Sequence, residues 1–92
     1  MPDTILLPPR LDAHAVEDLA NRLPDACEAA TVTMDASQVT HMSALAVQLI
    51  LAAARHLRAG GGQLHIATIS DRATEQLRVM GLTPTSLSEG LE

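Results

Sequence analysis

Apolar and polar residues alternate along the chain with two different periods, which predict three strands separated by helices. Ile5-Leu6-Leu7 is a short apolar run that Pro8-Pro9 ends, because proline has no N–H group for a sheet hydrogen bond. Thr31–Asp35 alternates with β-branched residues, and Gln63–Thr68 has a similar pattern. Each of these runs has the length and composition of a strand.

Helical spacing of the apolar residues predicts a helix after each strand. The first begins at a cap, Asp12, and is expected to end at Leu23, before Pro24. The second runs from about Ala44 to Ala59 and is followed by three glycines. The third is capped by Ser70 or Asp71 and ends at Gly81. The apolar positions of the first and third helices are Val16, Leu19, Ala20, Leu23, Ala73, Leu77 and Met80.

This order of elements predicts an α/β fold with a small, mainly parallel central sheet and right-handed crossovers. A chain of 92 residues fits a single domain, here spanning 1–92. We expect the packed core to cover about residues 4–82 and residues 83–92 to form a loosely ordered tail. The last two residues, Leu91-Glu92, resemble a cloning remnant.

Composition excludes several classes of function. The net charge is −5 and the six basic residues are scattered, and the chain has no Phe, Tyr or Trp for base stacking, so no nucleic-acid partner is expected. The single cysteine, Cys27, cannot form an internal disulfide, and Met1–Thr4 does not begin a signal peptide. The most apolar stretch, Leu45–Ala54, is too short to span a bilayer. We therefore expect a cytoplasmic protein without membrane insertion.

No motif of an enzyme or of a metal or cofactor site stands out. The glycines at 60–62 follow a helix and precede a strand, whereas a phosphate loop has the opposite order. The four histidines show no ligand spacing, so no metal is expected. Ser43 has no neighbouring glycine and does not form a nucleophile elbow. No enzymatic activity and no cofactor are predicted.

Ser43 stands directly before the second predicted helix, which leaves two interpretations. Its hydroxyl oxygen can accept a hydrogen bond from an unpaired backbone N–H as a helix cap. A phosphate at this position would also be tolerated, because a helix N-terminus favours negative charge. We favour the cap and keep Ser43 as phosphoacceptor as the minor alternative.

The run VTMDASQVTHMSALAVQLILAAARHLRAGGGQLHI, followed by SDRATEQLRVMGL, resembles the STAS domain of bacterial anti-sigma factor antagonists. The resemblance extends from Ile5 to about Leu82. In that family a strand ends in Asp, a D-S-S-G-L-G motif opens a helix that ends in Gly-Gly, and a later helix ends in a small residue, Gly and Leu. The matching positions are Asp35, Gly61-Gly62-Gln63 and Met80-Gly81-Leu82.

The family's phosphorylation motif is degenerate in this chain. Counting back from the glycines places Ser43 on the motif's Asp, Ala44 on its first serine and Leu45 on its second. The second serine is the phosphorylated one in regulated members, and leucine has no hydroxyl. The usual first strand of the family has no counterpart before Ile5. One sheet edge is therefore expected to be open or covered by a partner, and a homodimer could form there.

The resemblance implies a non-enzymatic protein-interaction module in bacterial signalling, in partner switching or chemotaxis. The implied partner is an anti-sigma factor or related serine kinase, a chemotaxis component, or the ATPase subunit of an MCE-type phospholipid transporter. The last would make the chain an ancillary transporter subunit, and a further alternative is a site for a nucleotide or another anion at the helix start. The expected partner-binding residues are Thr40, His41, Met42, Ser43, Ala44, Leu45 and Gln48.

The phase of the second helix decides whether Leu45 can contact a partner. We assign Ala46, Leu49, Ile50, Ala53 and Leu57 to the inward face. Leu45, Gln48, Ala52 and Arg55 then lie outward. In the alternative phase, Leu45 packs under the neighbouring loop.

Overall fold

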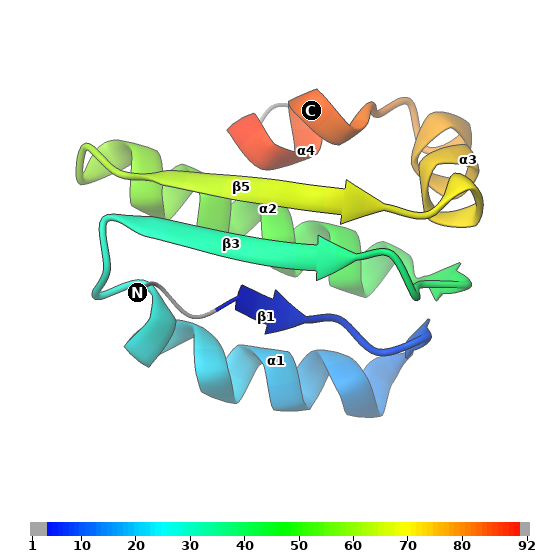
Figure 1. The fold of residues 1–92 in the computed structure, drawn as a ribbon, viewed down its shortest axis with the longest axis horizontal. Helices are drawn as coiled ribbons and strands as arrows, with labels where there is room; N and C mark the ends of the chain where they lie inside the picture. Colours follow the sequence, from blue (N-terminus) through cyan, green and yellow to red (C-terminus); the bar gives the residue numbers. More distant parts are fainter. Residues whose placement is uncertain (1–3, 91–92) are drawn as a thin grey trace.

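The computed structural model of the protein describes residues 4–90, which form an α/β fold around a small parallel sheet (Figure 1). The sheet has the order β1-β3-β5. Its strands are β1 (Thr4–Leu6), β3 (Thr31–Ala36) and β5 (Gln63–Ile69), close to the three predicted runs. The predicted fold class is confirmed.

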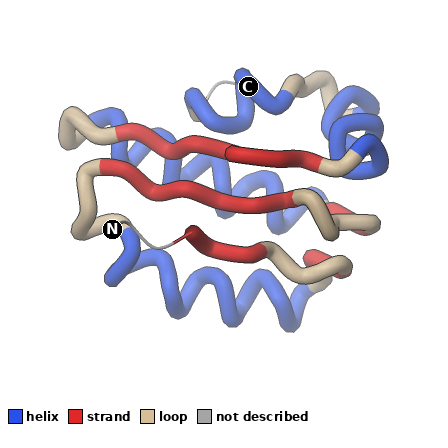
Figure 2. Tube along the Cα trace, in the orientation of Figure 1, coloured by secondary structure: helices blue, strands red, loops and turns tan. Residues whose placement is uncertain are grey.

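A second pair of strands was not predicted. Strand β2 (Arg10–Leu11) pairs in parallel with β4 (His41–Met42), beyond the end of the main sheet (Figure 2). Strands of two residues are too short to show a period in the sequence, so only the pairing reveals them. The segment expected to be a loop before the second helix is therefore partly a strand with a defined register.

Within residues 4–90, four helices connect and flank these strands: α1 (Ala13–Ala26), α2 (Ala44–Ala59), α3 (Asp71–Val79) and α4 (Pro84–Glu89). The predicted end of α1 at Leu23 is wrong, because the helix continues past Pro24 to Ala26. A proline inside a helix removes one N–H hydrogen bond, and this loss is tolerated in the last turn. After Pro24 the helical hydrogen bonding resumes, since the Cys27 N–H donates to the Leu23 carbonyl at 2.8 Å.

Helix α2 runs behind β3 and β5, α1 lies along β1, and α4 lies beside β5, so the helices leave the front face of the sheet open among the described residues (Figure 1). As expected, α2 turns Leu45, Gln48, Ala52 and Arg55 to the surface. Its inward face is wider than predicted, because α2 packs against α1, β5 and α4. Leu49 is only half-buried, and the buried residues are Ala46, Val47, Ile50, Leu51, Ala53, Ala54 and Leu57.

The expected loose tail is instead a packed helix over residues 84–89. Thr83 and Ser86 cap α4 reciprocally, and the Leu87 side chain is fully buried. Two arginines of α2 close its C-terminal end: Arg55 Nε donates to the Gly90 carbonyl at 2.8 Å and an Arg58 N–H to the Glu89 carbonyl at 2.8 Å. The core therefore extends beyond residue 82. Leu91-Glu92, the suspected cloning remnant, lies outside the described residues.

Two of the apolar residues that fall at helical spacing in the sequence are exposed rather than buried. Ala20 of α1 is exposed, and Met80, at the end of α3, is 39% exposed. Met80 is the C-cap of α3 and lies outside the helix proper. Its side chain therefore does not follow the helical spacing that turns Ala73 and Leu77 into the core. Within the described residues, no helix has both the length and the apolar character needed to cross a membrane.

Candidate protein-docking site

Ser43 is the N-cap of α2, as its position in the sequence predicts. Its extended backbone (φ −72°, ψ 158°) lets the side-chain oxygen accept a hydrogen bond from the Ala46 N–H at 3.2 Å. The same arrangement recurs at Asp12 for α1 and at Ser70 for α3. The capping interpretation of Ser43 is thus confirmed, whereas its modification stays a prediction.

Capping predicts a specific pattern of stability at position 43. Ser43→Ala should lower the free energy of unfolding by about 1 kcal/mol, because the Ala46 N–H loses its partner. Ser43→Asp should unfold at nearly the parent's denaturant concentration, since aspartate caps well and its charge suits the helix dipole. Chemical denaturation of both variants checks this. An equal loss in both would show that the hydroxyl acts in some other way.

Leu45 is exposed in the first turn of α2, immediately after the cap. Its side chain is 59% exposed, whereas Ala46 and Val47 are buried. The other predicted contact residues divide into two groups: Thr40, His41, Ala44 and Gln48 are exposed and Ser43 is half-buried, but Met42 is buried in the core. Met42 therefore supports the site from beneath rather than offering its side chain to a partner.

The end of α3 lies beside the start of α2, which sequence reasoning missed. Together they border an open groove of about 500 Å³, lined by His41, Met42, Ser43, Ala44, Gln76, Val79 and Met80. Val79 is 82% exposed and Met80 39% exposed. The end of α3 therefore contributes apolar side chains to the groove. A signal existed in the sequence: Val79 lies two residues after the inward Leu77, on the outward side of the helix.

Polar contacts from α3 hold the segment before α2 in place. Gln76 Nε2 donates to the Thr40 carbonyl at 2.9 Å, and Gln76 Oε1 accepts from the Met42 N–H at 2.5 Å. The Ser70 hydroxyl, which caps α3, also donates to the Val39 carbonyl. The positions of α3 and of the strand β4 are thus linked by side chains that sequence analysis did not assign to the site.

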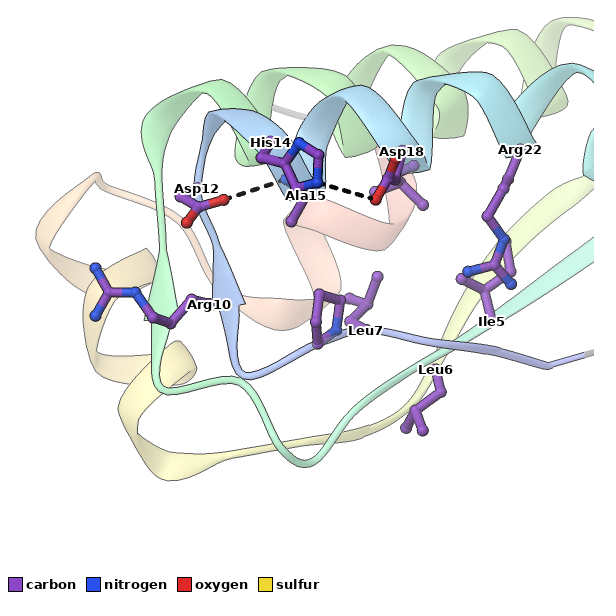
Figure 3. Close-up of a pocket in the computed structure, with 11 residues that line it drawn as sticks. Ile5, Leu6, Leu7, Arg10, Asp12, His14, Ala15, Asp18 and Arg22 are labelled. Carbon is purple, nitrogen blue, oxygen red and sulfur yellow. Dashed lines mark hydrogen bonds and ion pairs between the residues drawn. The ribbon is translucent and has the colours of Figure 1, made fainter.

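A second groove of about 430 Å³ lies between β1 and α1 (Figure 3). Within the described residues β1 pairs only with β3, so this is the open edge that the sequence predicts. Leu6 is 50% exposed and points away from α1 in the figure. Charges of both signs line the groove together with His14: Arg10, Asp12, Asp18 and Arg22. A homodimer through this edge stays a prediction.

Two acidic groups among the described residues have a shifted pKa. Hydrogen bonds from Ser37 lower the pKa of Asp35, at the end of β3, and burial raises the pKa of the Cys27 thiol. Neither residue lines the groove beside α2. Among residues 4–90, no group of three or more histidine, cysteine, aspartate or glutamate residues is placed to hold a metal ion. The groove beside α2 combines the exposed apolar side chains of Val79 and Met80 with the polar side chains of His41, Ser43 and Gln76.

Comparison with models of protein families places the chain in a known family. A family model described as "Mlab, STAS domain" matches residues 2–88, nearly the whole chain. The chain belongs to the STAS domain family. Comparisons with curated proteins and with solved structures gave no match. STAS domains are generally protein-interaction modules, which agrees with the exposed apolar side chains of Leu45, Val79 and Met80.

Proposed function

We propose that this STAS domain is a non-enzymatic docking module of bacterial signalling, acting in the cytoplasm in partner switching or in a chemotaxis-associated complex. The observation that carries the proposal is the exposure of Leu45 in the first turn of α2, beside an open groove. We define the docking surface as the exposed residues at the start of α2 and the end of α3: Thr40, His41, Ala44, Leu45, Gln48, Val79 and Met80.

The distribution of exposed apolar side chains supports this choice. Within the described residues four large hydrophobic side chains are exposed: Leu6, Leu45, Val79 and Met80. Three of them belong to the docking surface. Val79 and Met80 line the groove, and Leu45 directly follows Ala44, which lines it too. Exposed apolar residues of this kind favour a protein partner, because covering them removes apolar area from water, and one anchor can supply much of the binding energy.

The docking is proposed to be constitutive rather than switched by phosphate. The side chain at position 45 is leucine, so it offers no acceptor at the place where regulated family members have a serine. The Ser43 hydroxyl oxygen is already engaged by the Ala46 N–H. A partner would then bind whenever it is present, and its release would depend on concentration.

A permanent contact also fits a second candidate, an ancillary STAS subunit bound to the ATPase of an MCE-type phospholipid transporter. The missing hydroxyl at position 45 favours it, since a stable subunit needs no phosphorylation switch. The third candidate, a nucleotide or anion site, has less support. No arginine or lysine lines the groove, and phosphate sites usually combine a helix N-terminus with such cations.

Site-specific photo-cross-linking tests the proposal. A photoreactive amino acid would replace Leu45 in cells of the source organism, and a second variant would carry it in place of His65, which is exposed on β5. We expect one protein to be captured from position 45 and not from position 65. Mass spectrometry of the product then distinguishes a signalling protein from a transporter ATPase. Identical products from both positions would contradict the proposal.

A further inference from the structure

The side chain of Gln76 closes the free edge of β4. On one side, β4 faces β2: the His41 N–H donates to the Pro9 carbonyl at 3.1 Å and the Ser43 N–H to the Leu11 carbonyl at 3.3 Å. On the other side, the Thr40 carbonyl and the Met42 N–H meet the carboxamide of Gln76, at 2.9 and 2.5 Å.

These contacts follow the alternation of backbone groups along a strand. The N–H groups of His41 and Ser43 point to one edge of β4, so the intervening Met42 N–H and the Thr40 carbonyl point to the other. A residue of a neighbouring parallel strand would offer one N–H and one C=O at that place. The carboxamide of Gln76 supplies the same pair and replaces a neighbouring strand.

We propose that Gln76 is a positioning residue of the docking surface. It fixes β4, and with it the cap and first turn of α2, against the helix that carries Val79 and Met80. The two halves of the surface then form one ordered unit before the partner arrives, which spares the ordering of this segment on binding. The inference rests on the proposed function, because it concerns the same surface. A rival role for Gln76 is to stabilise the domain as a whole.

The experiment uses two substitutions of Gln76 that remove different numbers of its hydrogen bonds. Gln76→Leu removes both hydrogen bonds. Gln76→Glu keeps the acceptor for the Met42 N–H, but its ionised carboxylate has no donor and faces the Thr40 carbonyl. Protonation of the glutamate restores a donor to the Thr40 carbonyl, whereas the bond from the Met42 N–H favours the ionised form. Gln76→Glu should therefore loosen β4 at pH 7, though less than Gln76→Leu because the bond from the Met42 N–H remains, and recover toward the parent at about pH 4. Gln63→Glu, an exposed change at the start of β5, is the matched control.

The readout is amide hydrogen exchange at His41 and Ser43, whose N–H groups donate to the Pro9 and Leu11 carbonyls rather than to Gln76. We expect these two amides to lose about tenfold or more of their protection in Gln76→Leu at pH 7, and Met34 in the central strand to lose less. In Gln76→Glu the loss at pH 7 should be smaller and should disappear on acidification. An equal loss at Met34 would show a general stabilising role and overturn the proposal. So would unchanged exchange at His41 and Ser43.

Binding gives the second readout, with the protein captured by cross-linking at position 45 as the probe. In calorimetric titration Gln76→Leu should bind it about tenfold more weakly, and Gln63→Glu should bind like the parent. If Leu45→Glu abolishes binding and Gln76→Leu does not weaken it, the positioning role fails and the docking surface stands. If neither substitution affects binding, the surface lies elsewhere and both proposals fail.

Discussion

Leu45→Glu is expected to leave the fold intact while partner binding falls by at least about 2 kcal/mol, roughly thirtyfold in affinity. The side chain is 59% exposed, so its loss removes little from the core. A carboxylate in the first turn of a helix also suits the helix dipole. At an interface, however, the same charge would be buried without a partner in place of an apolar anchor. Thermal melting together with calorimetric titration of the cross-linked partner measures both effects.

Ala52→Glu is the matched control for this substitution. Ala52 is exposed on α2, and a glutamate there adds the same charge about two turns after Leu45. It should bind the partner like the parent. A collapsed melting temperature in Leu45→Glu would mean that Leu45 belongs to the core. Unchanged binding with an intact fold would point to another interface, and the groove between β1 and α1 is the next candidate.

Leu87→Ala is expected to lower the free energy of unfolding by about 2–5 kcal/mol, the usual range for a leucine truncated in a packed core. Leu87 is fully buried although it belongs to a helix of six residues near the end of the chain. Helix α4 packs against α2 and β5, so the truncation leaves a cavity between three elements. Urea denaturation followed by circular dichroism measures the loss.

Val79→Ala serves as the reference for Leu87→Ala. Its side chain is 82% exposed, so it should change stability by no more than about 0.5 kcal/mol. Similar small effects in both variants would mean that α4 is detached from the core in solution. A large effect confined to Leu87→Ala would establish that residues 84–89 are part of the cooperative domain.

The sequence by itself determined the order of the main elements and several of their ends. Helix α2 begins and ends at the predicted residues, Ala44 and Ala59, and Asp12 and Ser43 cap their helices as expected. These features depend on local interactions: a cap joins a side chain to a backbone group three residues later, and helical spacing is visible within one segment. The exposure of Leu45 followed from the same local phase of the helix.

Tertiary structure decided the features that join distant segments. Strands β2 and β4 exist only because they pair with each other, and α4 became recognisable as packed structure only through its contacts with α2 and β5. Gln76 reaches Met42 and Thr40 across 34 and 36 residues of sequence, and no local pattern marks that glutamine. The second half of the docking surface was missed for the same reason. Whether Val79 lies beside Ala44 is settled by the packing of α3 against β4, a long-range contact that residue spacing does not encode.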